Sequence, residues 1–256
     1  MMVKFEDYAA KYQHFRMERN NGILQVTFHT NGGPLRWSES AHRECGYAFT
    51  DIGADPDNKL IILTGSGSSF CSEMDIESFG DLGTPQGWNT IYWRGKRMLL
   101  NLLDIEVPII AAVNGPALIH AELALLCDII LAADTAEFQD EPHFKNGVVP
   151  GDGAHIIWPL LLGINRARYF LLTGQKLSAQ EALDLGVVNE VLPHDQLLSR
   201  AWELAEELVK QPPLTLRYTR VILTLQLKRI MQDMLGYGLA LEGMGVLDLS
   251  SADSES

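Results

Sequence analysis

An α/β fold built around a parallel sheet is predicted by three features of this 256-residue sequence. Short runs made only of apolar residues recur, which is typical of strands that are buried on both faces of a sheet. A turn rich in small residues and then a segment with helical periodicity follow these runs. The last part of the chain, in contrast, is almost entirely helical in pattern. We therefore expect a core domain over residues 1–195 and a helical C-terminal extension over residues 196–256.

The N-terminal half supplies the strands of the predicted sheet. The segment Ile23–His29 alternates apolar and polar residues after an Asn-Asn-Gly turn, as expected for a strand. Three apolar runs are predicted to be buried strands: Leu60–Leu63, Ile109–Val113 and Ile129–Ala132. Helices are predicted from about Ser40 to Asp51, with Ser38 or Ser40 as the N-cap, and over Trp88–Leu103.

The C-terminal third is predicted to contain a series of helices. Their expected ranges are Arg166–Leu172, Ser178–Leu185, Gln196–Lys210 and Leu214–Leu235. Internal repeats and low-complexity linkers are absent from the sequence, so nothing divides the chain further.

Composition narrows the classes of function. The formal net charge of −13 repels phosphate backbones and anionic lipids, so nucleic acid and membrane partners are not expected. Three widely spaced cysteines without a CxxC motif argue for a reducing compartment. No Cys/His cluster has zinc-finger or HExxH spacing, so neither a metal nor a cofactor is predicted. The N-terminus has no apolar signal core, and the chain has no run of about 18 apolar residues. We therefore expect a cytoplasmic location.

Three segments, in order, carry a resemblance to a known family. They read LIILTGSGSSFCSEMDIESF (60–79), VPIIAAVNGPALIHAELALLCDIILAADTAEFQD (107–140) and HFKNGVVPGDGAHIIWPLLLGINRARYFLLTGQKLSAQEALDLGVVNEVLP (143–193). The chain resembles the crotonase (enoyl-CoA hydratase/isomerase) superfamily. The resemblance implies a spiral fold of ββα units and a homotrimer or dimer of trimers, with a helical C-terminal trimerisation region. Met231, Met234 and Met244 in that region suit a subunit interface.

The sequence departs from that superfamily at the positions that carry its chemistry. Its members stabilise an enolate with two backbone N–H groups, one of which lies in a glycine run that is replaced here by Leu118-Ile119-His120. Glu122 matches one of the two glutamates of the hydratases, but His143 occupies the place of the other. Asp152 occupies a small-residue position in the turn Pro150-Gly151-Asp152-Gly153. These exchanges indicate a change of reaction.

The combination resembles one branch of the superfamily, that of 6-oxocamphor hydrolase and related β-diketone hydrolases. Segments that carry this resemblance include Phe138-Gln139-Asp140, Pro142-His143-Phe144 and Trp37-Ser38 with His42. The branch cleaves a carbon–carbon bond between two carbonyls with water and without CoA. The substrate implied for this chain is therefore a cyclic or bicyclic β-diketone, cleaved to a keto acid by a retro-Claisen reaction.

Six residues are candidates for this chemistry. His143 is predicted to activate water, since its unperturbed pKa of roughly 6.5 lies near working pH. Asp152 is predicted to accept its other ring N–H, as in a Ser-His-Asp triad. His120 is predicted to donate to the carbonyl that becomes an enolate. The candidate substrate-binding residues are Trp37, His42 and Glu242, of which Glu242 could also relay a proton.

Other interpretations of these residues remain open at this point. Asp152 could be the N-cap of the following helix, and His155 is a competing partner for it. Glu122 could have only a structural role, and Glu242 could be a solvated carboxylate. The alternative enzyme is a CoA-thioester hydratase or isomerase, which needs backbone donors at 118–120 and a carboxylate at 143. A binding or scaffold protein is the alternative outside the enzymes.

Overall fold

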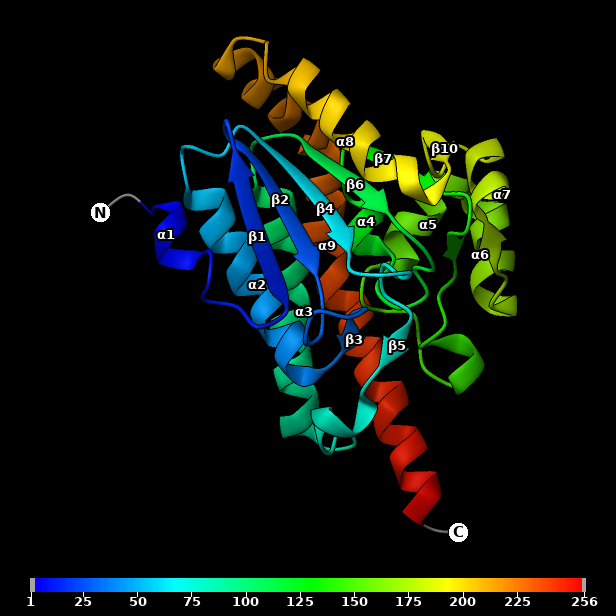
Figure 1. Cartoon of the computed structure of the whole chain (residues 1–256). Coiled ribbons are helices and arrows are strands. Elements are labelled where there is room, and N and C mark those ends of the chain that lie inside the picture. The colour runs from blue at the N-terminus through cyan, green and yellow to red at the C-terminus, as the bar shows by residue number, and fades with distance from the viewer. Residues whose placement is uncertain (1–2, 255–256) are drawn as a thin grey trace.

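A six-stranded sheet lies at the centre of the computed structural model, which describes residues 3–254 (Figure 1). The strand order is β1-β2-β4-β6-β7-β10; β1 is antiparallel to β2, and every other neighbouring pair is parallel. The strands are β1 (Phe15–Asn20), β2 (Ile23–Phe28), β4 (Leu60–Gly65), β6 (Ile109–Val113), β7 (Ile129–Ala133) and β10 (Glu190–Leu192). The predicted α/β class with a parallel sheet and a helical C-terminal region is confirmed.

The apolar runs in the sequence became the inner strands because both faces of the sheet are covered. Every residue of β4 and β6 is buried. At the antiparallel edge, Asn21 and Gly22 connect β1 to β2 with φ angles of 51° and 83°. These positive values suit the two-residue turn that the Asn-Asn-Gly sequence predicted.

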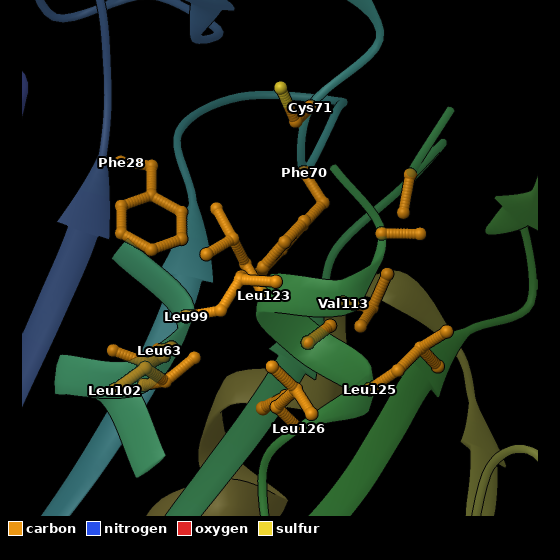
Figure 2. Close-up of a cluster of buried hydrophobic side chains, with 14 of the residues drawn as sticks. Phe28, Leu63, Phe70, Cys71, Leu99, Leu102, Val113, Leu123, Leu125 and Leu126 are labelled. Carbon is orange, nitrogen blue, oxygen red and sulfur yellow. The ribbon is translucent and has the colours of Figure 1, made fainter. Parts of the chain in front are cut away.

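Helices cover the two faces unequally. On one face, α2 (Glu39–Ala54), α3 (Pro85–Asp104) and α9 (Pro213–Ser254) pack against one another and enclose the larger core. Figure 2 shows part of this core, where leucines of α3 and α4 (Glu122–Leu125) meet Phe28, Leu63 and Val113 from the sheet. On the other face, α8 (His194–Leu208) lies along β4, β6 and β7 and buries Leu197, Ala201 and Ala205.

The remaining elements are short. They are α1 (Phe5–Tyr8), β3 (Arg36–Trp37), β5 (Glu73–Met74), η1 (Ile76–Phe79), β8 (Glu137–Phe138), η2 (Phe144–Asn146), α5 (Ala154–Leu162), α6 (Ile164–Thr173), β9 (Leu177–Ser178) and α7 (Ala179–Asp184). Within residues 3–254, no helix combines the length and the apolar character needed to cross a membrane.

Two helix boundaries are informative. The first helix of the core begins at Glu39, and the Ser38 side chain accepts a hydrogen bond from the Ala41 backbone N–H, so Ser38 is the N-cap. The final helix was predicted to end at Leu235 but continues to Ser254. Glycines beyond position 235 weaken the helical pattern of the sequence. In the fold, Gly238 and Gly243 instead allow close packing, against His155 and Trp88.

The methionines of α9 differ in exposure. Met231 is buried in the core of the chain, so the suggestion that it serves a subunit interface was wrong, whereas Met234 and Met244 are exposed.

Small ribbons bring distant loops together beyond the carboxyl ends of the parallel strands. Strand β3 pairs with β5, and β8 pairs with β9. Isolated bridges also join Ala117 to Cys71 and to Phe138. The segments that follow β2, β4, β6 and β7 therefore meet at one edge of the sheet. This is where open α/β sheets place their ligand sites.

Candidate active site

A largely apolar pocket lies where these segments meet α3 and α9. It is lined by Trp37, His42, Met74, Ile76, Phe79, Leu82, Trp88, Ile91, Gly95, His120, Pro142, His143, Val148, Asp152, Leu239 and Glu242. All six candidate residues from the sequence are among them. No lysine or arginine lines the pocket, and its ionisable side chains are three histidines and two carboxylates.

His143 is positioned by a carboxylate other than the one predicted. Its Nδ1 lies 2.5 Å from Asp140 Oδ1, and both side chains are buried. Its Nε2 lies 3.6 Å from Asp152 Oδ2 and 3.5 Å from Glu242 Oε1. The predicted pairing in which Asp152 orients the histidine was therefore wrong. The tight turn between residues 140 and 143 places the Asp140 carboxylate at Nδ1 instead. Asp152 and Glu242 instead face the ring nitrogen that points into the pocket.

His120 has its own carboxylate. Its Nδ1 lies 2.6 Å from Glu122 Oε1 and 3.3 Å from Asp152 Oδ2. The residue has φ 48°, a left-handed conformation that is uncommon for residues other than glycine, although histidine adopts it more often than most side chains do. Such local strain is concentrated at functional sites.

Asp152 lies between the two histidines. It belongs to the turn before α5, whose N-cap is Gly153 with φ 118°; Asp152 is therefore not the N-cap. A Cβ on Gly153 would lie 2.5 Å from the Leu99 side chain, so this turn packs tightly against α3. The His155 ring contacts the Pro150 and Met234 backbone carbonyls and interacts with Asp152 only through charge.

Glu242 reaches the pocket because α9 approaches closely on both sides of it. A Cβ on Gly238 would lie 2.1 Å from the His155 ring, and one on Gly243 would lie 2.1 Å from Trp88 Nε1. The Trp88 indole donates a 2.8 Å hydrogen bond to the Leu239 carbonyl within the helix. These contacts hold the Glu242 carboxylate, which is only 6% exposed, against His143.

Trp37 and His42 line the pocket beside His120. The Trp37 ring lies 4.3 Å from the His120 ring, centroid to centroid, and the His42 ring is nearly parallel to that of His120 at 6.1 Å. Both side chains are buried, and His42 Nδ1 has no hydrogen-bond partner in the structure. Burial lowers the pKa of His42 to about 3, and the neighbouring His120 adds to this effect, so His42 is neutral at working pH.

The pKa values of the other two pocket histidines, His143 and His120, are raised instead. Burial alone would lower the pKa of His143, but Asp152, Asp140 and Glu242 outweigh it and raise that pKa well above its usual value. Burial also lowers the pKa of His120, but Glu122 and Asp152 outweigh it, so that this pKa is raised. Burial raises the pKa of Glu242 to about 7. The pKa of Asp152 is lowered, because the two histidines outweigh the effect of its burial. These shifts favour the protonated form of both imidazoles and the ionised form of Asp152.

Sequence reasoning missed Asp140 as a site residue and left Glu122 without a role. Asp140 appeared only as part of a resembling segment, although its spacing of three residues from His143 was visible. Glu122 lies two residues from His120, a spacing that by itself does not indicate contact. Only the turns at 120–122 and 140–143 bring each carboxylate to its imidazole.

Comparison with known proteins places this geometry in a family. The sequence model of the enoyl-CoA hydratase/isomerase family matches residues 18–240. Carnitinyl-CoA dehydratase of Salmonella enteritidis PT4 is 33% identical over 206 residues, covering 80% of this chain and 77% of that protein. Short-chain-enoyl-CoA hydratase of Clostridium acetobutylicum is 32% identical over 213 residues, covering 80% and 81%. The chain belongs to the enoyl-CoA hydratase/isomerase family.

A solved structure gives a more specific likeness. It is a β-diketone hydrolase from the cyanobacterium Anabaena sp. PCC 7120, bound to (S)-3-oxocyclohexyl acetic acid. That protein is 54% identical to this chain, with a TM-score of 0.94, and the match covers 95% of this chain and 98% of that one. The resemblance to the superfamily and to β-diketone hydrolases is thereby confirmed.

Proposed function

We propose that this protein hydrolyses a carbon–carbon bond of a cyclic or bicyclic β-diketone, giving a keto acid without CoA. The observation that carries the proposal is the pair of buried histidines, His120 and His143, each with Nδ1 against its own carboxylate at 2.6 and 2.5 Å. This pair lies in a largely apolar pocket whose lining includes no lysine or arginine. Such a pocket suits a neutral diketone better than the polyanionic CoA. The 54% identical β-diketone hydrolase supports the same substrate class.

The first step requires a base for water. When Nδ1–H of His143 donates to Asp140, the lone pair of the neutral ring lies on Nε2, which faces the pocket. Because the pKa of His143 is raised, the ring must first pass its Nε2 proton to Glu242, 3.5 Å away. The pKa of Glu242, about 7, suits a group that accepts and returns a proton near neutral pH. Asp140 is thus a positioning residue, and His143 and Glu242 share one proton.

The bond changes then balance. His143 Nε2 takes a proton from water, and the water oxygen bonds to one carbonyl carbon. The tetrahedral intermediate collapses, the bond between that carbon and the α-carbon breaks, and the electron pair moves into an enolate. His120, whose pKa Glu122 and Asp152 raise, donates from Nε2 to the enolate oxygen. Glu242 gives its proton to the α-carbon, which leaves a ketone, a carboxylic acid and the original His143 imidazolium.

A CoA-thioester hydratase or isomerase is the second candidate, since the curated relatives carry those activities in their names. A hydratase of this family would use a carboxylate where this chain has His143. The pocket also has no lysine or arginine for a polyanionic ligand. We therefore rank this activity second.

The deciding experiment compares two substrates on the same preparation. A symmetric bicyclic 1,3-diketone is supplied without CoA, and crotonyl-CoA is supplied separately. We expect turnover of the diketone, followed by the appearance of the keto acid, and no hydration of the thioester. Turnover of the thioester alone would refute the proposal. If neither reacts and His143→Ala changes no measurable property, the scaffold interpretation gains.

We also propose the trimeric assembly expected from the family. Several large apolar side chains of α9 are exposed in the single chain, including Ile222 and Leu223 at 69% and 72%. Burial of such residues between subunits is the usual reason for a patch of this kind. Light scattering after size exclusion should give the mass of three or six chains; a monomer would contradict this assembly.

A further inference from the structure

We propose that His143, Asp152 and Glu242 form a binding site for a divalent transition metal, represented by Zn²⁺, and that an ion bound there blocks hydrolysis. The metal site itself goes beyond the proposed function, whereas its inhibitory effect rests on that function. The site could not be predicted from the sequence, because its residues do not follow any short metal-binding spacing.

His143 Nε2 and each of the two carboxylate oxygens lie at close to the separation that a tetrahedral ion requires. His143 Nε2 lies 3.6 Å from Asp152 Oδ2 and 3.5 Å from Glu242 Oε1, and the three atoms lie within 4.8 Å of one another. Zinc bonds of about 2.1 Å to nitrogen and oxygen place neighbouring ligand atoms about 3.4 Å apart. An ion could therefore bind all three without a change in the backbone. Since all three residues line the pocket, the fourth position would face the cavity.

The outer contact of His143 also suits metal binding. Histidines that bind metals usually donate their other ring N–H to a carboxylate, which fixes the ring and leaves the second nitrogen free. Here Asp140 Oδ1 lies 2.5 Å from Nδ1. His143 is therefore held with Nε2 directed at the proposed ion.

Buried carboxylates provide a further reason for a cation. Four of them, Glu122, Asp140, Asp152 and Glu242, lie around His120 and His143, and the lining includes no lysine or arginine. Glu242 is 94% buried and directed at His143, yet its Oε2 has no hydrogen-bond partner in the structure. A buried carboxylate oxygen without a partner is costly, and coordination to a cation would offset that cost.

A second group of possible ligands is less suitable. His120, Glu122 and Asp152 also lie close together, but His120 Nδ1 is only 2.6 Å from Glu122 Oε1. Two atoms on one zinc ion would be about 3.4 Å apart, so this hydrogen bond would have to break. The His143 group loses no short hydrogen bond when it binds an ion.

Cobalt(II) provides a direct test because its tetrahedral complexes absorb visible light. Untagged, full-length, metal-free protein is titrated with Co²⁺, and Zn²⁺ is then added in competition. We expect one equivalent of Co²⁺ per chain with a tetrahedral absorption band, which Zn²⁺ removes. His143→Ala and Glu242→Gln should each abolish the band, while Asp140→Asn should weaken affinity about 10- to 100-fold. His194→Ala, at the start of α8 and outside the pocket, is the matched control and should retain the band.

Circular dichroism of each variant shows whether a lost band reflects lost folding. Binding that does not saturate at one equivalent, or a band that persists in both His143→Ala and Glu242→Gln, would overturn the site. Turnover that is unchanged by saturating Zn²⁺ would overturn the inhibitory effect. The proposed hydrolase activity is measured separately on metal-free protein. Failure there, with the cobalt band intact, would refute the hydrolase and leave the metal site standing.

Discussion

The exchange Asp140→Asn removes one charge from the hydrogen bond that holds His143. The carboxylate lies 2.5 Å from Nδ1 in a buried setting, so it both selects the ring tautomer and stabilises the imidazolium. An asparagine can present its NH₂ group to Nδ1, which places the proton on Nε2 and removes the base. The corresponding exchange in a Ser-His-Asp triad lowers kcat about 10⁴-fold, and general-base catalysis contributes about 10²- to 10⁴-fold. We expect kcat on a bicyclic diketone to fall within that range, about 3–5 kcal/mol of barrier.

The assay separates positioning from binding. Asp140 does not line the pocket, so KM should change little while kcat falls. Asp134→Asn, an exposed aspartate just after β7, is the matched control and should leave kcat unchanged. Thermal unfolding of both variants shows whether the fold is intact. A folded Asp140→Asn variant that keeps more than about a tenth of the kcat would refute the positioning role, because the loss would then lie below the range for general-base catalysis.

Asp152→Asn is expected to abolish hydrolysis and leave the circular dichroism spectrum unchanged, because the ionised carboxylate lies 3.3 and 3.6 Å from the two imidazoles; an active variant would remove Asp152 from the mechanism. His120→Asn, whose side chain tolerates the left-handed backbone, should lower kcat about 10²- to 10³-fold, and a loss below tenfold would contradict its role as donor. The kcat/KM should rise with pH through about 7, because Glu242 must ionise before Glu242 and His143 together hold a single proton. At higher pH the kcat/KM should fall again, when that proton is lost. In Glu242→Gln the rise near pH 7 should disappear; a profile that keeps it would assign the titration to another group. Gly243→Ala places a Cβ 2.1 Å from Trp88 Nε1 and should destabilise the fold by about 1–3 kcal/mol, which would be measured as a lower Tm. Gly245→Ala, whose Cβ would have its nearest contact at 3.3 Å, is the milder control. Equal Tm values for the two variants would show that the Trp88 contact is not tight.

Local patterns were enough to predict most of the fold. The apolar runs at 60–63, 109–113 and 129–132 all became inner strands, because burial on both faces is a property that each run shows by itself. The length of α9 was not predictable in this way. Its glycines weaken a helix in isolation, and only the neighbouring His155 and Trp88 rings make them useful.

The sequence by itself determined which kinds of side chain the pocket would hold. Histidines at 120 and 143 and an aspartate at 152, in a chain that otherwise resembles the family, indicate a changed reaction. Only the tertiary structure decided which carboxylate each histidine contacts. Asp140, not Asp152, orients His143, and Glu242 comes from about a hundred residues beyond His143 along the chain. A hydrogen bond depends on distances of a few tenths of an ångström between loops and helices, and the spacing of residues along the chain does not set those distances.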